Sequence, residues 1–325
     1  MEATDAYRAM LEELLDCSGA GVVVSSHDGT IALLRAHRAR LEQRVRLALA
    51  DERALSIAVN KERTLEAARR LGLDVPREVV VRAVEDVPRA LNEIGLPAVV
   101  KPSESWVSDG REGTWVGPRL VVNSDEARHA VEAVTRFGDA ALFQQFLTGK
   151  REAVSFLYAN GEVCARFAQW AKRTRPPLGG QSVVRQSIAI PPDIGRQAES
   201  LVREINPRLS ASVEVAVRAG VDFPYLVYQW ASGGPIDKVS RYRVGGWMRH
   251  LGGDIERLIT ALGERGRPGI TPPVRTVLDF GLSFFKPMRY DYLDWKDPLP
   301  AVRATTDITH GVIRRFLSRV KRDLS

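Results

Sequence analysis

The strongest local signal in the sequence is the dipeptide Asn160-Gly161, which separates two runs of β-forming residues. Asn-Gly tolerates the two positive φ angles that a type I′ turn requires, so the sequence predicts a β-hairpin at this point. Because a hairpin joins antiparallel strands, we expect antiparallel pairing to dominate the middle of the chain.

Helical and strand signals alternate in the N-terminal part. Residues 6–16 have the apolar spacing of a helix, residues 21–25 form a short β-branched run, and a second helix is expected over about 30–40. This stretch is too short for a complete doubly wound α/β domain. We therefore predict a partial, Rossmann-like α/β domain over residues 1–58.

A capped helix and two strands are predicted next. Asn60 can cap a helix that Gly72 ends, and residues 79–81 form the following strand. The apolar run 96–102 is of the buried type and closes with a lysine. Because a charged group is not buried alone, Lys101 is expected at a sheet end that faces a cleft.

Composition narrows the function classes. With 44% hydrophobic and 27% charged residues, the chain of 325 residues matches ordinary soluble globular proteins. No apolar run approaches the roughly 20 residues of a membrane span. The acidic N-terminus carries no secretory signal, which favours a cytoplasmic location.

The charged and metal-binding residue types are scattered. Cys17 and Cys164 lie far apart and the five histidines stand singly, so neither zinc nor a disulfide framework is predicted. The net charge of +7 comes from arginines spread over the whole length. This pattern favours a solvated cationic surface over nucleic-acid binding, which we rank last.

Five segments follow one another in an order that points to a family. They are Lys61 at a helix start, Leu71–Pro76, Pro97–Pro102, Gln144–Glu152 and Glu204–Arg208. Together they resemble the ATP-grasp superfamily, in the branch of carboxylate–amine ligases similar to carbamoyl phosphate synthetase. The resemblance covers roughly residues 20–240.

The resemblance implies an α+β fold in which two α+β subdomains clasp ATP. This ATP-grasp domain is expected over residues 59–240, after the partial α/β domain that precedes it. Residues 241–325 are expected to form a C-terminal helical extension without nameable chemistry.

Site residues carry over by their place in the motifs. Lys61 and Lys101 match the two lysines that reach the phosphates of ATP, and an ammonium on a flexible stem suits phosphate oxygens. Glu152 matches the acidic residue that accepts hydrogen bonds from the ribose. The segment that resembles the adenine-binding hinge consists of Gln144, Gln145, Phe146 and Leu147. For Lys61, a surface lysine at a helix start is the alternative.

Two loops complete the expected site. Residues 103–117 occupy the place of the phosphate-covering loop, in which Trp106 and Trp115 are unusual. Residues 173–182 resemble a basic, glycine-rich loop near the substrate. The arginines of that loop are expected either to hold a carboxylate or to lie in a solvated turn.

The last motif implies magnesium ligands. In relatives, its glutamate and asparagine, here Glu204 and Asn206, hold Mg²⁺ together with an acidic residue on a preceding strand. Arg208 is expected to stabilise the transferring phosphoryl group. A helical pattern runs directly into this motif, leaving no room for the roughly 15 residues of two strands and a turn. A segment is therefore absent near 205/206, either deleted from the protein or lost from the sequence.

The function implied by the resemblance is an ATP- and Mg²⁺-dependent carboxylate–amine ligase. The carboxylate forms an acyl phosphate, and an amine or another nucleophile then displaces phosphate. Partners are small-molecule carboxylate and amine substrates, with a homodimer as a further possibility. Two alternatives stay open: a non-catalytic ATP-binding relative and a carboxylase of the biotin-dependent kind.

Overall fold

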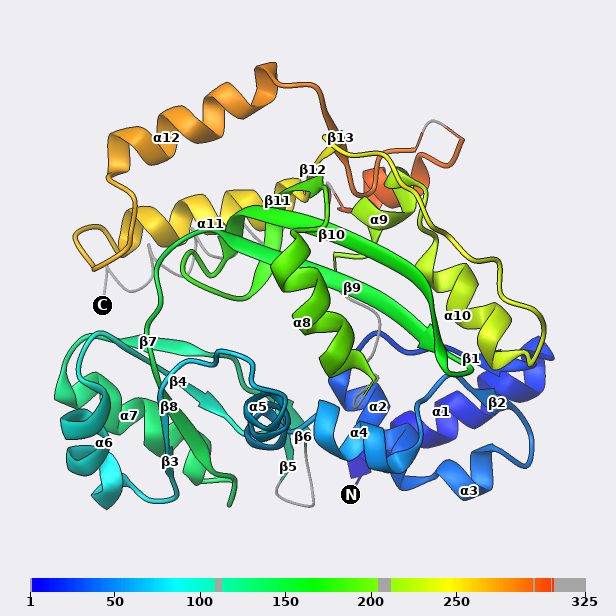
Figure 1. Cartoon of the computed structure of the whole chain (residues 1–325), viewed down its shortest axis with the longest axis horizontal. Coiled ribbons are helices and arrows are strands. Elements are labelled where there is room, and N and C mark those ends of the chain that lie inside the picture. Colours follow the sequence, from blue (N-terminus) through cyan, green and yellow to red (C-terminus); the bar gives the residue numbers. More distant parts are fainter. Residues whose placement is uncertain (1, 109–112, 204–211, 295, 305, 307–325) are drawn as a thin grey trace.

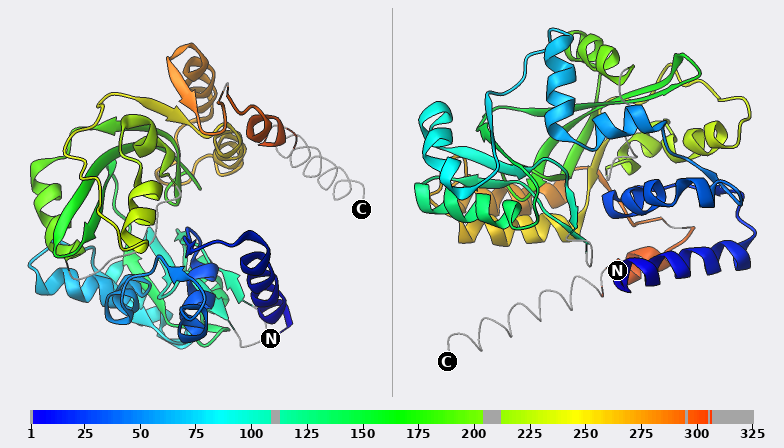
Figure 2. Two further views of the ribbon diagram at one scale, coloured as in Figure 1. Left: turned by 90° about the vertical axis from the view of Figure 1, so that its right-hand side faces the viewer. Right: turned by 90° about the horizontal axis from the view of Figure 1, so that it is seen from below.

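The computed structural model describes residues 2–108, 113–203, 212–294, 296–304 and 306. Two larger sheets and an N-terminal part make up this portion of the chain (Figure 1). In the left view of Figure 2, the N-terminal part and the smaller sheet, blue to teal, lie below the larger sheet, green to yellow. Within the described residues, no helix is both long and apolar enough to cross a membrane.

The N-terminal part packs helices around a two-stranded parallel sheet. In chain order its elements are α1 (Glu2–Ser18), β1 (Val22–Val23), α2 (Asp28–Ala36), α3 (Arg38–Leu41), β2 (Arg46–Leu47) and α4 (Glu52–Ala58). The core is built from buried Ile31, Leu34, Leu41 and Leu55. The single helix expected over 30–40 is two helices, because the chain leaves the helical conformation at His37. The Rossmann-like description of this part stays a prediction.

The smaller sheet has four strands in the order β3-β8-β4-β7 and is covered on one face by helices. Its elements are α5 (Lys61–Arg70), β3 (Glu78–Val81), η1 (Val84–Asp86), α6 (Val87–Ile94), β4 (Ala98–Pro102), β7 (Arg119–Val121), α7 (Ser124–Thr135) and β8 (Ala141–Gln145). Ala98 and Val100 of β4 are buried against the helices. Because side chains alternate along a strand, Val99 and Lys101 project from the opposite face.

Local signals in this region are confirmed. The Asn60 side chain accepts a 3.0 Å hydrogen bond from the Arg63 amide and so caps α5, and Gly72 follows with a positive φ of 70°. The expected loop over 103–117 is more regular than a loop. Its described residues include a short antiparallel pair, β5 (Trp106–Ser108) and β6 (Gly113–Trp115).

The larger sheet has five strands in the order β13-β12-β11-β10-β9. β9 (Arg151–Ala159) and β10 (Glu162–Arg175) are the predicted hairpin, with φ of 53° at Asn160 and 83° at Gly161. The remaining elements are β11 (Gln181–Ile188), α8 (Pro192–Val202), α9 (Glu214–Ala219), α10 (Phe223–Ala231), β12 (Trp247–Arg249) and β13 (Met288–Tyr290). α9 and α10 pack on the sheet through Val215, Phe223 and Leu226.

The C-terminal part joins the larger sheet. It contains the expected helices, α11 (Leu251–Gly263) and α12 (Pro273–Leu282), followed by η2 (Ser283–Phe285). It also supplies β12, antiparallel to β11, and β13, parallel to β12. The position beside β11 is thus filled by Trp247, Met248 and Arg249, none of which is acidic. Domain boundaries at 58/59 and 240/241 stay predictions.

Candidate functional site

Lys101 lies where the sequence analysis placed it, at the end of a buried strand. β4 pairs with β8 on one side and β7 on the other, and Lys101 stands opposite Leu142 of β8. Its side chain is half-buried. Burial lowers the pKa of the Lys101 ammonium, Glu78 raises that pKa and Arg151 lowers it further.

Lys61 is fixed beside the end of the same strand. Its backbone N–H donates to the Ser103 carbonyl at 2.8 Å, and its Nζ donates to Ser105 Oγ at 3.0 Å. These bonds attach the start of α5 to the residues that follow β4. Lys61 is half-buried, and burial and then the charge of Lys101 lower its pKa to about 8. Its assignment to the phosphates stays a prediction.

The two lysines are 40 positions apart in sequence, yet the positive charge of Lys101 acts on Lys61 in the fold. Like charges held together in a half-buried place are unfavourable without an anion. Asp28, Asp139 and Glu104 offset part of this repulsion by raising the pKa of Lys61. The arrangement is suited to binding an anion that carries several negative oxygens.

The segment proposed as the hinge lies next to Lys101, on β8 and just beyond it. The Gln144 side chain is buried and donates to Glu78 Oε2 at 3.3 Å, while the Gln145 amide donates to the Arg77 carbonyl at 2.9 Å. Phe146 is half-buried and Leu147 is 58% exposed. The Gln144 side chain is thus engaged within the sheet, which leaves backbone groups beyond β8 for a ligand.

Glu152 lies near the start of β9, half-buried and opposite Trp170 of β10. Its neighbour Arg151 is a site residue that the sequence analysis missed. The charge of Arg151 lowers the pKa of Lys101, and burial lowers the pKa of the Arg151 guanidinium itself. Arg151 Nη1 also donates to the Gly180 carbonyl at 2.5 Å. The only available signal was its place directly before Glu152.

Arg173 is engaged within the protein and is not available to bind a substrate carboxylate. Its side chain is buried and donates to Asp254 Oδ2 at 2.6 Å, Ser283 Oγ at 3.0 Å and the Asp279 carbonyl at 3.0 Å. The expectation for the arginines of this loop is therefore wrong for Arg173. Through these hydrogen bonds, Arg173 of β10 holds α11 and η2 against the sheet.

The metal-binding motif cannot be placed. Glu204, Asn206 and Arg208 lie outside the described residues. Among the residues that are described, no group of three or more His, Cys, Asp and Glu side chains is arranged to hold a metal ion. The roles predicted for Glu204, Asn206 and Arg208 therefore rest on the sequence motif alone.

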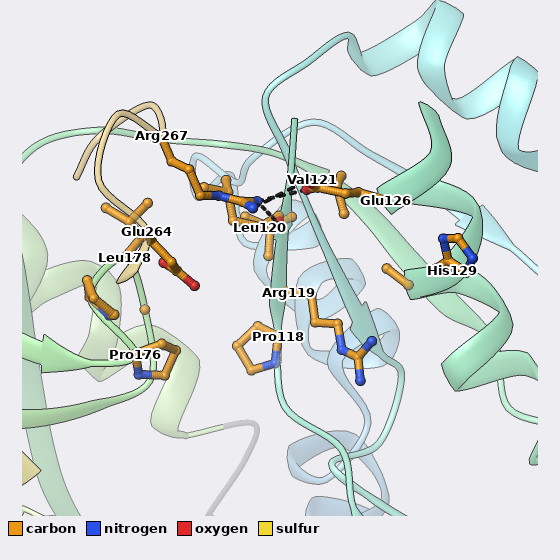
Figure 3. Close-up of a pocket in the computed structure, with 14 residues that line it drawn as sticks. Pro118, Arg119, Leu120, Val121, Glu126, His129, Pro176, Leu178, Glu264 and Arg267 are labelled. Carbon is orange, nitrogen blue, oxygen red and sulfur yellow. Dashed lines mark hydrogen bonds and ion pairs between the residues drawn. The ribbon is translucent and has the colours of Figure 1, made fainter. Parts of the chain in front are cut away.

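A cavity of about 390 Å³ opens between the two sheets (Figure 3). Val99 and Leu120 of the smaller sheet line one side, and Pro176 and Leu178 from the β10–β11 turn line the other. Arg267, in the loop after α11, closes it by donating to Glu126 at 2.7 and 3.2 Å and to the Leu120 carbonyl at 3.3 Å. The cavity therefore adjoins the sheet face that bears Lys101.

Known proteins share this architecture. The chain superposes on biotin carboxylase from Campylobacter jejuni with a TM-score of 0.57 and 16% identity, over 73% of this chain and 60% of that one. It also superposes on an ADP complex of N5-carboxyaminoimidazole ribonucleotide synthetase with a TM-score of 0.54 and 16% identity, over 82% of this chain and 81% of that one. No family model matches the chain.

These likenesses show the ATP-grasp fold, which the ordered motifs of the sequence predicted. Among curated proteins, it is similar to D-alanine–D-alanine ligase of Chromohalobacter salexigens, 30% identical over 32% of this chain and 31% of the relative. The enzyme of Xanthomonas axonopodis pv. citri is 31% identical over 31% of each chain. The chain thus spans about a third of the length of the curated relatives it matches.

Proposed function

We propose that this protein is an ATP- and Mg²⁺-dependent ligase that activates a carboxylate as an acyl phosphate for attack by an amine or another nucleophile. The observation that carries the proposal is the half-buried pair Lys61 and Lys101, which suits a polyphosphate, within an ATP-grasp fold. The names of its relatives support it, since D-alanine–D-alanine ligases join a carboxylate to an amine.

In this proposal the nucleotide lies along the face of the smaller sheet that bears Lys101. Backbone groups of residues 144–147 read the adenine, Glu152 accepts hydrogen bonds from the ribose, and Lys61 and Lys101 hold the phosphates. By their place in the sequence motif, Glu204 and Asn206 would hold magnesium, and Arg208 would stabilise the transferring phosphoryl group. Bound magnesium would neutralise phosphate oxygens.

The chemistry proceeds in two displacements. A carboxylate oxygen attacks the γ-phosphorus of ATP, the bond to ADP breaks, and an acyl phosphate forms. The nucleophile then attacks the acyl carbon, inorganic phosphate leaves, and an amine loses its proton. Because such transfers depend on positioning and charge neutralisation, the residues of this chain act by fixed positive charge and orientation.

The test is ATP-dependent phosphate release over a panel of carboxylates and amines. Lys101→Ala removes one fixed charge at the phosphates and is expected to lower the rate by roughly 100-fold or more. Lys238→Ala removes a lysine that is exposed and paired with Glu162, and serves as the matched control. Unchanged turnover in Lys101→Ala would remove Lys101 from this role.

A non-catalytic ATP-binding protein is the second candidate, favoured by one observation. The acidic strand that precedes the glutamate of the metal-binding motif in relatives is absent before Glu204 in this sequence. Tight ATP binding without phosphate release on any panel member would support this candidate. Bicarbonate-dependent ATP hydrolysis would instead indicate the biotin-dependent kind of carboxylase.

We also propose a homodimer. A neighbour in fold, the biotin carboxylase domain of a 2-oxoglutarate carboxylase from Hydrogenobacter thermophilus, is described as a dimer. Light scattering coupled to size-exclusion chromatography tests this proposal. A mass of 36.0 kDa, that of one chain, would indicate a monomer and contradict it.

A further inference from the structure

Helix α12 lies at the outer edge of the molecule, where it packs on α11 (Figure 1). The left view of Figure 2 shows it, in orange, at the top of the larger sheet. Its Thr276 side chain is 1% exposed and donates to the Thr271 carbonyl at 3.0 Å. The Asp279 carbonyl accepts from the buried Arg173 at 3.0 Å. The side of α12 that bears Thr276 therefore faces the protein, and the opposite side faces solvent.

The apolar side chains of α12 are on its solvent side. At about 100° per residue, they fall within an arc of about 140° whose centre lies nearly opposite Thr276. Each is at least half exposed, and they are Val274, Val277, Leu278 and Leu282. A surface helix of a soluble protein normally has the reverse arrangement, with its apolar stripe toward the core. Burial within this chain therefore does not account for the pattern.

The same surface continues into η2. Phe284 is half exposed, with the Arg249 guanidinium 4.2 Å from its ring centre, and Phe285 is 87% exposed. No other large apolar side chain among the described residues is as exposed as Phe285. The apolar face of α12 and η2 thus consists of Val274, Val277, Leu278, Leu282, Phe284 and Phe285. Single exposed apolar residues need no explanation, whereas a contiguous group indicates an interaction surface.

Positive side chains border the apolar face. Arg275 lies on α12 itself, Lys286 follows η2, and Arg289 lies in the adjoining strand β13. All three are exposed, and within the described part of the chain none of them forms an ion pair. The one acidic residue of α12, Asp279, is half-buried. The surface that surrounds the apolar face is therefore cationic.

We propose that the apolar face of α12 and η2 binds the surface of a bilayer that contains anionic lipids. Its side chains enter the boundary between headgroups and acyl chains, and Arg275, Lys286 and Arg289 contact the lipid phosphates. Helix α12 then lies in the plane of the membrane surface and does not cross it. The inference is independent of the proposed ligase function, because none of these residues is assigned to the nucleotide.

The charges distinguish the possible occupants of this surface. A second copy of the chain would bring two cationic borders together, and like charges repel. The C-terminal sequence carries the same sign, since it contains Arg314, Arg315, Arg319, Lys321 and Arg322. An anionic bilayer offers the opposite charge beside an apolar interior. Phe and Leu on one face with Lys and Arg beside them are also typical of helices that bind in the membrane interface.

Co-sedimentation of the full chain with vesicles tests binding directly. The probes are vesicles of phosphatidylcholine alone and vesicles in which about 30% of the lipid is phosphatidylserine. We expect roughly ten-fold or more tighter binding to the anionic vesicles, because each basic residue near an anionic surface favours binding. At about 1 M salt, where charges are screened beyond about 3 Å, this preference should disappear. Equal binding to both kinds of vesicle, or to neither, would overturn the proposal.

Apolar variants locate the contact. Leu278→Gln and Phe285→Ser each remove an exposed apolar side chain and should weaken binding to anionic vesicles by roughly ten-fold. Leu14→Gln on α1 is the matched control, because Leu14 and Leu278 are both 57% exposed, and it should bind as the wild type does. Each variant should unfold at the wild-type temperature, since exposed positions contribute little to stability. Unchanged binding in both Leu278→Gln and Phe285→Ser would refute this location.

A charge variant tests the border. Lys286→Gln should reduce the preference for anionic vesicles by roughly five-fold. Lys238→Gln removes the same charge from an exposed position that is paired with Glu162, and should leave the preference intact. An equal reduction in both variants would show that net charge alone attracts the protein, which would reject the border as a binding surface.

Light scattering of the same variants separates the rival occupant. If the wild type binds no vesicles and Leu278→Gln converts a dimer into a monomer, the apolar face is an interface between two copies and the membrane proposal is wrong. If Leu278→Gln loses vesicle binding while its mass in solution stays that of the wild type, the membrane contact is supported.

Discussion

Asp254 is a fully buried carboxylate held between two buried guanidinium groups. Its Oδ2 accepts from Arg249 Nε at 2.8 Å and from Arg173 Nη2 at 2.6 Å, and the Asp254 and Arg249 side chains are 0% exposed. Asp254→Asn keeps the shape but removes the charge. Two buried cations then lack their counter-ion, which costs about 3–5 kcal/mol of unfolding free energy.

The packing around this cluster supports the upper part of that range. Burial already lowers the pKa of the Arg173 guanidinium, and the charge of Asp254 is the largest effect that raises it again. Arg249 lies over the rings of Phe280 and Phe284, at 4.5 and 4.2 Å, so water cannot replace the carboxylate readily. For 325 residues the unfolding entropy is about 0.7 kcal/mol/K, so the loss corresponds to a fall in Tm on the order of 4–7 °C.

Urea unfolding followed by tryptophan fluorescence measures the loss, because Trp247 lies in the same strand as Arg249. Glu42→Gln is the control, since it breaks an exposed Arg38–Glu42 pair with an N–O distance of 2.8 Å and should cost less than about 1 kcal/mol. If Asp254→Asn unfolded within about 1 kcal/mol of the wild type, the buried cluster would not hold the C-terminal part to the sheet as described.

Three further predictions concern the site. Because burial and Lys101 hold the pKa of Lys61 at about 8, the lysine loses its charge above this pH, and ATP affinity measured from pH 7 to 9.5 should fall there. Lys61→Met should flatten that profile, and a fall that persists in the variant would reject the assignment. Gly29→Ala places a Cβ 2.9 Å from Trp106 and should cost about 1–3 kcal/mol in thermal unfolding. The control is Gly21→Ala, whose added Cβ would have no atom within 4 Å and should not lower the stability. Arg267→Ala breaks a pair whose side chains are 30% and 33% exposed, so stability should change by less than about 1 kcal/mol. Amide exchange in residues 264–270 should nevertheless speed up, and unchanged exchange would count against the contact.

Local chemistry made part of the fold predictable. The Asn160-Gly161 turn, the Asn60 cap and the strand that ends in Lys101 each depend on residues close together in sequence. The motif order then indicated which of these segments meet, and the charge coupling between Lys61 and Lys101 agrees with it.

The remaining features depend on contacts between distant segments. Nothing near Arg173 indicates that its charge is balanced by Asp254, because the partner lies 81 positions away. The three-residue strands β12 and β13 carry no alternation long enough to recognise. No local pattern accounts for Trp106 in the segment 103–117, because Gly29 and Gly113 lie against its ring only in the folded chain.

Equilibrium dialysis with labelled ATP and Mg²⁺ decides whether the lysine pair is a nucleotide site. The wild-type protein should bind ATP, and Lys101→Met should weaken binding by roughly ten-fold or more, since a charge-assisted bond to phosphate contributes about 1.5–3 kcal/mol. Lys238→Met should bind as the wild type does. Equal affinity of the wild type and Lys101→Met, or no binding by the wild type, would contradict the proposed site.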